Sequence, residues 1–173
     1  MEISNEMRNS YYSPPIRDNL RLCSCGSKKK YPYCCGMYLS GKKKPDTAEK
    51  LMRSRYTAFA QGNVDYLIAT LDPEKRKPND FDELTKSINN TQWLGLTILN
   101  THKGKKNDVD GCVEFEAIYK ISEPGQLHER SCFRKIDGEW FYVDGDILPG
   151  TIPQSKDLCW CKSGKKYRQC HGI

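Results

Sequence analysis

The hydrophobic pattern of residues 46–90 predicts three helices. Over residues 48–60, apolar and aromatic side chains recur every three or four positions, as on the buried face of a helix. Asp46 is a typical N-cap residue for this helix, and Gly62 is a typical stop signal. A second helix is predicted directly after Gly62, and a third begins at Asp80.

Beyond residue 90 the pattern changes to an alternation of apolar and polar positions, which is typical of strands with one buried face. The alternating segments are 92–101, 112–121, 127–136 and 139–144. Pro124-Gly125 and Asp137-Gly138 are the turn signals between the later segments. Three helices followed by a meander of about four antiparallel strands predict an α+β domain over 46–150, with a curved sheet packed on the helices.

Most cysteines lie in two short segments outside this predicted domain. Residues 23–36 are CSCGSKKKYPYCCG, and residues 159–172 are CWCKSGKKYRQCHG. Both follow the pattern C-x-C-x8-C-[C or H]-G, and together they hold seven of the nine cysteines. We predict a first knuckle over 21–38 and a second knuckle over 155–173. The aperiodic segment 1–20 is predicted to be an N-terminal arm.

Paired thiols at this spacing favour zinc, which takes four soft or borderline ligands in a tetrahedron. The predicted ligands are one set per knuckle: Cys23, Cys25, Cys34 and Cys35, then Cys159, Cys161, Cys170 and His171. The alternatives are disulfides, reduced structural thiols or an iron–sulfur cluster. The histidine in the second set argues against disulfides, because imidazole replaces a thiolate at zinc but cannot form a disulfide. We therefore predict two zinc ions per chain.

Charge and hydropathy indicate where such a protein would act. No apolar run approaches the roughly 20 residues of a membrane span, and the first twelve residues lack the features of a signal peptide. We therefore expect a cytoplasmic protein with reduced thiols. The formal net charge is +6, with basic residues concentrated at the two ends and a mildly acidic middle.

Both knuckle sequences resemble the SEC-C motif, C-x-C-G-S-G-K-K-Y-x-x-C-[CH]-G, the zinc-binding module at the C-terminus of the SecA translocation ATPase. Lys28 replaces the second glycine of this motif in the first copy, and Lys162 replaces the first glycine in the second copy. Segments 53–73 and 130–146 resemble the bacterial YchJ family. The resemblance covers 22–172 and implies a middle domain similar to the cone-shaped fold of nuclear transport factor 2.

A basic stretch occupies the same place in both knuckles. Its residues are Lys28, Lys29, Lys30 and Tyr31 in the first, and Lys165, Lys166, Tyr167 and Arg168 in the second. Such a stretch is often only a solvated face, and RNA or anionic lipid are further candidates. The resemblance to SecA, whose knuckle docks an acidic surface of the SecB chaperone, favours an acidic protein partner, with RNA second.

Three functions are therefore compatible with the sequence. The favoured one is a non-enzymatic adaptor that binds partners through its knuckles. The second is a cone-pocket enzyme or small-ligand-binding protein in which the knuckles only fasten the chain ends. The third is a nucleic-acid-associated protein.

A curved sheet on helices encloses a conical cavity. The polar residues predicted near it are Tyr56, Asp72, Trp93, Glu116, His128, Arg130 and Asp144. Tyr56 also belongs to an apolar helical stripe, and Glu116 is expected near Arg134 across the hairpin, as an ion pair. His128 and Arg130 are expected to be solvated near the turn. No acid–base pair is identified, so the pattern does not predict catalysis.

Cys112 and Cys132 lie outside the cysteine repeat. With a hairpin centred on Pro124-Gly125, these two cysteines would not face each other. We therefore expect two buried free thiols. A nucleophilic role has no partner signal in the sequence.

Overall fold

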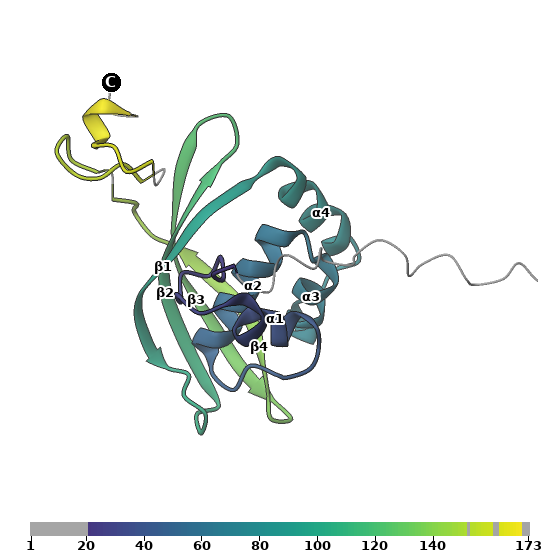
Figure 1. The fold of residues 1–173 in the computed structure, drawn as a ribbon. Helices are drawn as coiled ribbons and strands as arrows, with labels where there is room; N and C mark the ends of the chain where they lie inside the picture. Colours follow the sequence, from purple (N-terminus) through teal and green to yellow (C-terminus); the bar gives the residue numbers. More distant parts are fainter. Residues whose placement is uncertain (1–20, 152, 161–162, 171–173) are drawn as a thin grey trace, which may run out of the picture.

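The computed structural model describes residues 21–151, 153–160 and 163–170 of the chain. A four-stranded antiparallel sheet forms a curved layer whose concave face is covered by helices (Figure 1). The helices are α1 (Cys35–Leu39), α2 (Ala48–Gln61), α3 (Val64–Ala69) and α4 (Asp80–Asn90). The strands are β1 (Gln92–Lys103), β2 (Asp110–Lys120), β3 (Pro124–Ile136) and β4 (Glu139–Ile147). Helices α2, α3 and α4, followed by a meander in the order β1-β2-β3-β4, confirm the predicted cone, whereas α1 belongs to the first knuckle.

The start of α2 differs from the prediction by one residue. Thr47 is the N-cap, and its Oγ1 accepts a hydrogen bond from the Lys50 N–H at 3.2 Å. Asp46 instead pairs through Oδ1 with the Lys50 ammonium at 2.6 Å. Gly62 ends the helix in the left-handed conformation (φ +76°), as predicted, because glycine adopts it without steric cost.

The β2–β3 hairpin has a register different from the predicted one. Lys120 pairs with Pro124, so the turn is formed by residues 121–123 and Pro124 is the first residue of β3. A proline is tolerated at the start of a strand. A Cβ on Gly125 would lie 2.7 Å from the Tyr119 ring on the facing strand. This glycine therefore makes room for an aromatic side chain and is not a turn residue.

The hydrophobic core fills the space between the helices and the inner face of the sheet. The sheet contributes Leu96, Val113, Phe115, Ala117, Phe133 and Trp140, and α2 contributes Ala48, Leu51, Met52 and Tyr56. Register shifts in β1 and between β3 and β4 add to the curvature of the sheet. Three cysteines of the first knuckle, Cys23, Cys25 and Cys35, belong to the same core cluster.

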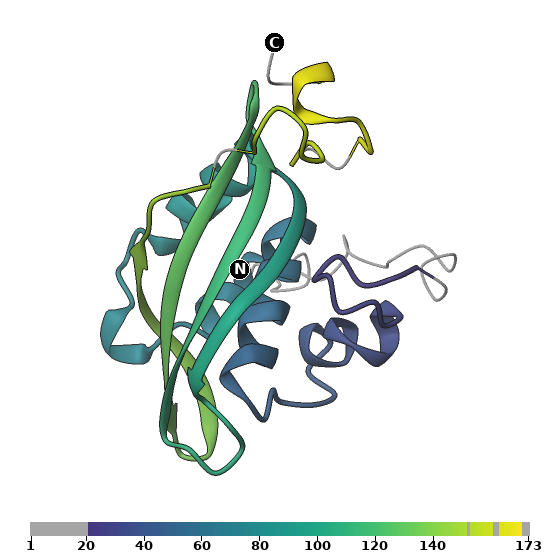
Figure 2. The same ribbon diagram turned by 90° about the vertical axis from the view of Figure 1, so that its left-hand side faces the viewer.

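The two knuckles occupy different parts of the molecule (Figure 2). The first lies beside α2, on the helical side of the sheet. The second follows β4 and lies at the end of the sheet where the β2–β3 turn is found. In the described part of the chain, no helix combines the length and the hydropathy that crossing a membrane would require.

Candidate metal centre

The first knuckle begins with a narrow hairpin loop. The Cys23 N–H donates to the Lys29 carbonyl at 2.7 Å. Inside the loop, Gly26 (φ +74°) and Lys28 (φ +61°) adopt the left-handed conformation, which reverses the chain within a few residues. A 3-10 helix, η2 (Tyr31–Tyr33), then leads into α1, whose first residue is the fourth predicted ligand.

This path brings four thiols together. The Sγ atoms of Cys23, Cys25, Cys34 and Cys35 all lie within 4.8 Å of one another. The Sγ of Cys34 is 3.6 Å from that of Cys25 and 3.9 Å from that of Cys35. Four sulfurs bound to one zinc at about 2.3 Å in a tetrahedron are about 3.8 Å apart. The four thiols are free and fit the zinc site predicted for this knuckle.

The surroundings distribute the protons unequally among these thiols. Burial raises the pKa of the Cys34 thiol to about 11. Hydrogen bonds with Cys23 and Cys25 raise the pKa of Cys35, whereas hydrogen bonds from Cys23 and Cys35 lower the pKa of Cys25. Of these three thiols, Cys25 is therefore the most easily ionised. Because zinc binds thiolates, occupation of the site would displace protons from Cys34 and Cys35, whose pKa values are raised.

The first knuckle is built into the domain core. Cys25 is fully buried, and its carbonyl accepts a hydrogen bond from Nη1 of Arg53 in α2 at 2.7 Å. A Cβ on Gly26 would lie only 2.5 Å from the Leu96 carbonyl oxygen of β1. The start of the loop, at Cys25 and Gly26, is therefore held between a helix and the sheet, and its glycine permits this close approach.

In its described residues, 155–160 and 163–170, the second knuckle repeats the backbone path of the first. The Cys159 N–H donates to the Lys165 carbonyl at 2.8 Å, which matches the 2.7 Å bond of the first knuckle. The 3-10 helix η4 (Tyr167–Gln169) occupies the place of η2. The Oγ of Ser163 lies 3.5 Å from the Cys170 Sγ, and the equivalent distance in the first knuckle is 3.1 Å. The two loops thus share one scaffold.

Cys161 and His171, the other predicted ligands of the second knuckle, lie outside the described residues. Cys159 is buried, and Cys170 is half-buried. The zinc site of the second knuckle therefore rests on the repeated sequence pattern and the repeated backbone, and it stays a prediction.

The basic stretches of the knuckles divide into exposed cations and packed tyrosines. The exposed members are Lys28, Lys29, Lys30, Lys165, Lys166 and Arg168. Within the described ranges none of them forms an ion pair with a carboxylate. The Tyr31 hydroxyl donates to Gln61 Oε1 at 3.0 Å, and the Tyr167 ring packs edge-on against Trp160. The tyrosines therefore help to hold the knuckles in place, whereas the cations are exposed.

Two of the predicted pocket residues line a real cavity. Tyr56 and Trp93 lie in the wall of a cavity of about 520 Å³ between α2, α4 and the inner face of the sheet. Their ring centroids are 5.7 Å apart in an edge-on arrangement. Tyr56 is also buried, as its place in the apolar stripe of α2 predicts.

Asp72 lies at the sheet edge beside β4 and not in the cavity wall. Its fully buried carboxylate forms an ion pair with the Arg134 guanidinium. Burial opposes ionisation, but the hydrogen bonds from Arg134 and from the Glu74 N–H outweigh it and lower the pKa of this carboxyl. Asp144, also predicted near the cavity, is exposed and lies 3.9 Å from Lys75. These groups fasten an edge and form no catalytic pair.

Glu116 and Arg130 lie on the outer face of the sheet, away from the cavity. In the observed register Glu116 faces His128 and not Arg134, so the predicted cross-strand ion pair is wrong. The cause is the displaced turn, which shifts β3 along β2. Arg130 is exposed, as expected, and its Nη2 lies 3.0 Å from Asp146 Oδ2.

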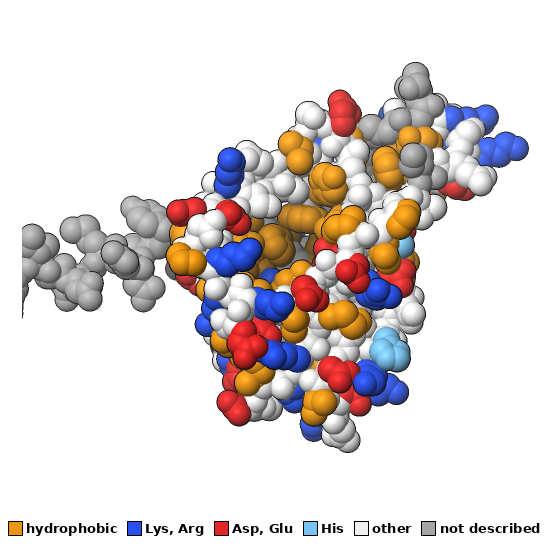
Figure 3. Space-filling model, turned by 180° about the vertical axis from the view of Figure 1, so that it is seen from behind, with side chains coloured by type: hydrophobic (Ala, Val, Ile, Leu, Met, Phe, Trp, Pro, Cys, Tyr) orange, Lys and Arg blue, Asp and Glu red, His pale blue; other side chains and the backbone are white. Residues whose placement is uncertain are grey.

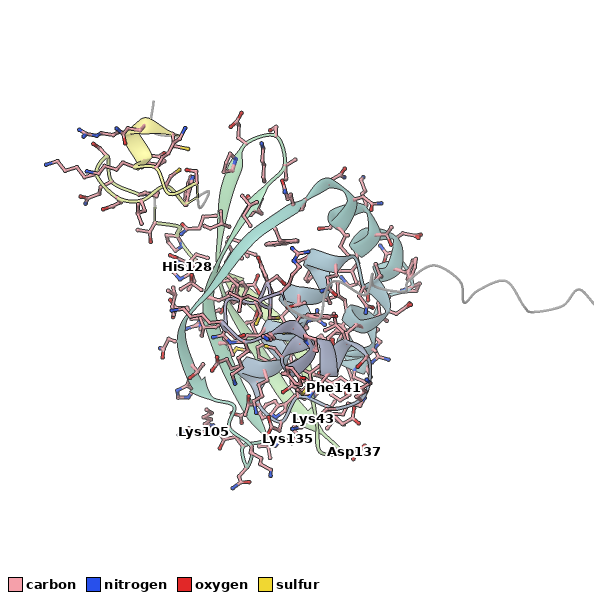
Figure 4. All side chains as sticks on the ribbon, viewed as in Figure 1. Lys43, Lys105, His128, Lys135, Asp137 and Phe141 are labelled. Carbon is pink, nitrogen blue, oxygen red and sulfur yellow. A yellow bond between two sulfur atoms is a disulfide. The ribbon has the colours of Figure 1, made fainter. Side chains whose placement is uncertain are left out.

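His128 lies on the same outer face (Figure 4), but it is not solvated as predicted. Only 14% of its side chain is exposed. Its Nδ1 lies 2.7 Å from the Pro149 carbonyl, and its Nε2 lies 2.8 Å from Glu114 Oε1. These two hydrogen bonds raise the pKa of the imidazole. The expectation failed because the segment after β4 folds back over this face.

Cys112 and Cys132 form a disulfide and are not free thiols. They occupy directly opposite positions of β2 and β3, with Cα atoms 4.1 Å apart. The prediction failed for the same reason as the ion pair, because it placed the turn at Pro124-Gly125. The alternating pattern alone does not determine the register of a hairpin.

Four charged residues that line the cavity were not predicted, namely Arg55, Asp80, Glu83 and Glu129. Arg55 and Glu129 line the cavity, the first from α2 and the second from β3. A signal for Arg55 exists in the sequence, because a charged residue occupies a position of the apolar helical stripe. Glu129 has no such signal, since its inward direction depends on the hairpin register.

Fold and site together define a class, a domain of the nuclear transport factor 2 type combined with SEC-C knuckles. Residues 47–145 match the family model "YchJ, middle NTF2-like domain", and residues 156–173 match the SEC-C motif. The solution structure of RPA3114, a SEC-C motif containing protein from Rhodopseudomonas palustris, is 35% identical with a TM-score of 0.68, covering 75% of this chain and all of that one. The crystal structure of a SEC-C motif containing protein from Psychrobacter arcticus is 27% identical with a TM-score of 0.66, and the match covers 91% of this chain and 98% of that one.

Close sequence relatives extend over nearly the whole chain. A UPF0225 protein of Serratia proteamaculans is 42% identical over 87% of this chain and 97% of its own length. A UPF0225 protein of Haemophilus influenzae is 40% identical over 89% of this chain and 93% of its own length. The chain belongs to the YchJ family, as its sequence resemblance implied. Its SEC-C motif and four-cysteine cluster fit a zinc-binding role.

Proposed function

We propose that the protein is a cytoplasmic, non-enzymatic adaptor that binds two zinc ions and docks an acidic protein partner through its knuckles. The observation that supports this function is the exposed positive charge, which has no carboxylate partner in the described chain and occurs on both knuckles. Lys29 and Lys30 occupy positions equivalent to those of Lys165 and Lys166 on one repeated backbone scaffold, and Lys28 adds a further cation to the first knuckle. Basic side chains project from the second knuckle in Figure 3.

A zinc-fixed loop suits electrostatic docking. The hydrogen bonds around each loop hold its backbone, so the lysines are presented from fixed positions and a partner loses little additional entropy on binding. Complementary charge accelerates encounter and selects against basic partners. Zinc pins the loop and leaves the lysines outside the site, which separates the structural role of the thiols from the binding role of the cations.

The proposal is tested by reversing charge on one knuckle at a time. One variant changes Lys28, Lys29 and Lys30 to Glu, and a second changes Lys165 and Lys166 to Glu. A third variant, Lys105→Glu with Lys106→Glu, matches the charge change of the second at exposed positions in the β1–β2 turn (Figure 4). The wild type and each variant serve as affinity bait in a nuclease-treated cell lysate. Each captured protein is then purified, and its affinity for every bait is measured by direct titration.

The adaptor function would be supported by an acidic protein that binds the wild type and the turn variant equally well. Its affinity for either knuckle variant should be at least about tenfold lower. Equal capture by all baits would overturn it. Binding that disappears with nuclease, and that poly(U) RNA reproduces with a steep salt dependence, would replace the protein partner by RNA.

The metal count is tested separately. Native mass spectrometry of the reduced full-length protein should find two zinc ions per chain. The Cys34→Ser and Cys170→Ser variants should each lose one ion. A wild-type protein with no bound metal would contradict the zinc part of the proposal, whatever the outcome of the binding experiment.

A further inference from the structure

The cavity under the sheet has the size and lining of a small-molecule site. Its volume of about 520 Å³ lies within the range of ligand pockets. Its wall is mainly apolar and aromatic, with Met52, Tyr56, Phe59, Trp93, Phe115 and Leu127. Figure 3 shows a hollow lined by hydrophobic side chains on this side of the molecule.

A buried cation without a carboxylate partner lies in this wall. Arg55 is 6% exposed, and its Nη1 donates to the Leu67 carbonyl and to Thr70 Oγ1, both at 2.7 Å. The guanidinium lies over the Tyr142 ring, 4.7 Å from its centroid. In the described part of the chain Arg55 forms no ion pair, and its Nε and Nη2 donate no hydrogen bond. A buried charge in this state is costly, because it has lost its hydration.

Trp93, another residue of the cavity wall, carries a second unpaired donor. The indole Nε1 of Trp93 is buried and has no hydrogen-bond partner among the described residues. The Trp93 ring contacts Phe59 and Tyr119 as well as Tyr56, so the indole is held in an aromatic cluster. A buried N–H without an acceptor is rare in native proteins.

The acids that line the wall already have hydrogen-bond donors or face solvent. Asp80 Oδ2 accepts a hydrogen bond from the Lys77 N–H at 2.7 Å. The carboxylate of Glu129 accepts a hydrogen bond from the Ser131 hydroxyl and forms no ion pair with Arg55 among the described residues. Burial raises the pKa of this carboxyl, against the opposing effects of Ser131 and Arg55. Asp80 and Glu83 of α4 also line the cavity, and the Glu83 side chain is exposed to solvent. The unmet demand inside the cavity is therefore for a hydrogen-bond acceptor with negative charge.

We propose that this cavity binds a small aromatic carboxylate, with its carboxylate on Arg55 and its ring against Tyr56, Phe59 and Trp93. An anionic oxygen satisfies the free guanidinium nitrogens and neutralises the buried charge, and guanidinium and carboxylate match in geometry. The aromatic cluster supplies edge-on and stacking contacts to a ring. This site lies beyond the adaptor function and does not depend on it.

The test uses the zinc-loaded full-length protein and defined probes. Benzoate, 1-naphthoate and indole-3-acetate are titrated by calorimetry and by tryptophan fluorescence, each beside its uncharged primary amide. We expect at least one acid to bind, with its amide at least about tenfold weaker. This comparison needs no variant, so it holds even if a substitution at Arg55 impairs folding. No binding of any acid below about 1 mM, or equal binding of acid and amide, would overturn the proposal.

Two variants locate the site. Arg55→Met should abolish the preference for the acid over the amide. Trp93→Phe keeps an aromatic ring but loses one donor, and it should lower the affinity for the acid about threefold to tenfold. The lysine-to-glutamate variants of both knuckles should bind the acid as the wild type does. An acid preference that survives Arg55→Met in a folded protein would place the anion elsewhere and contradict the assignment.

Discussion

The two knuckles are the same loop in different surroundings. They share the cysteine spacing, the loop hydrogen bond between equivalent residues and the 3-10 helix before the third ligand. The first is enclosed by α2 and β1 and contributes three cysteines to the domain core. The second is joined to the domain by the segment after β4. One loop motif thus forms part of a core in one place and an appended module in the other.

This difference predicts different roles for the two zinc ions that we propose. A small loop has no core of its own, so its zinc contributes directly to its folding. Where the loop is part of a larger core, loss of the ion also removes packing from the helices and the sheet. Zinc in the first knuckle should therefore stabilise the whole domain, and zinc in the second should stabilise only the second knuckle.

Removal of one ligand from each knuckle is the most severe test of this comparison. Cys23→Ser should lower the stability of the domain by about 3 kcal/mol or more, or roughly 10 °C in Tm. The matched Cys159→Ser should change the Tm of the domain by less than about 2 °C. Both changes remove one ligand from a buried cysteine position. Thermal melting followed by circular dichroism, with zinc content measured on the same samples, compares them.

Chelation of the wild type provides a control that needs no substitution. A strong chelator should release zinc in two phases, the fast one without loss of the domain melting transition and the slow one together with it. Equal Tm losses for the two serine variants, or a single release phase, would show that the two knuckles are energetically alike.

A second test uses two glycines with the same backbone conformation. Gly26 and Gly164 have φ values of +74° and +76°. A Cβ on Gly26 would meet the Leu96 carbonyl, whereas none of the described atoms lies within 4 Å of a Cβ on Gly164. Gly26→Ala should therefore cost about 2–4 kcal/mol of domain stability, and Gly164→Ala only the local cost of about 1 kcal/mol. Urea denaturation of both variants measures the difference, and similar losses would contradict the close packing of the first loop.

Local features of this molecule could be predicted from its sequence. The four ligands of the first knuckle lie within thirteen residues, so their spacing alone indicated the site. The helices and strands followed from periodicity, and the cone from the family resemblance. Pro124-Gly125 misled because a turn signal is local, whereas Gly125 is required by a ring on the facing strand. The Cys112–Cys132 disulfide and the inward direction of Glu129 depend on the resulting register.

Contacts between segments that are far apart in the sequence could not be predicted from the hydrophobic pattern either. The burial of the first knuckle depends on the approach of Gly26 to β1, some seventy residues away, and no periodicity reports such a contact. The same limit applies to His128, whose cover comes from the segment after β4. Spacing thus predicts which residues can bind a metal, but not whether the resulting loop lies inside or outside the core.

The attachment of the second knuckle should depend on pH through His128. The Pro149 carbonyl and the Glu114 carboxylate raise the pKa of this imidazole above its ordinary value. The resulting stabilisation, about 1 kcal/mol, is therefore complete below pH 6.5 and is lost as pH rises through the elevated pKa. In an NMR titration, the Leu148 amide, bonded to the His128 carbonyl, should follow the imidazole. Glu114→Gln should lower the pKa of His128. An imidazole that titrates below its ordinary value would show that these two hydrogen bonds do not hold the segment after β4 on the sheet.

Relief of backbone strain in the first knuckle should have the smallest effect. Lys28 has a φ of +61°, at the position where the second knuckle has Gly164. A side chain in the left-handed region costs about 1 kcal/mol, and the greater freedom of glycine in the unfolded chain offsets part of the gain. Lys28→Gly should therefore raise domain stability by up to about 1 kcal/mol, because this loop belongs to the core.

The neighbouring Lys29→Gly removes the same charge without relieving a positive φ, and it should be slightly destabilising. The difference between these two variants, measured by urea denaturation, isolates the backbone contribution from the charge. The reverse substitution, Gly164→Lys, should leave the domain transition unchanged and accelerate zinc release from the second knuckle only. If Lys28→Gly were no more stable than Lys29→Gly, the strained lysine would not be coupled to the domain, and the first knuckle would be as independent as the second.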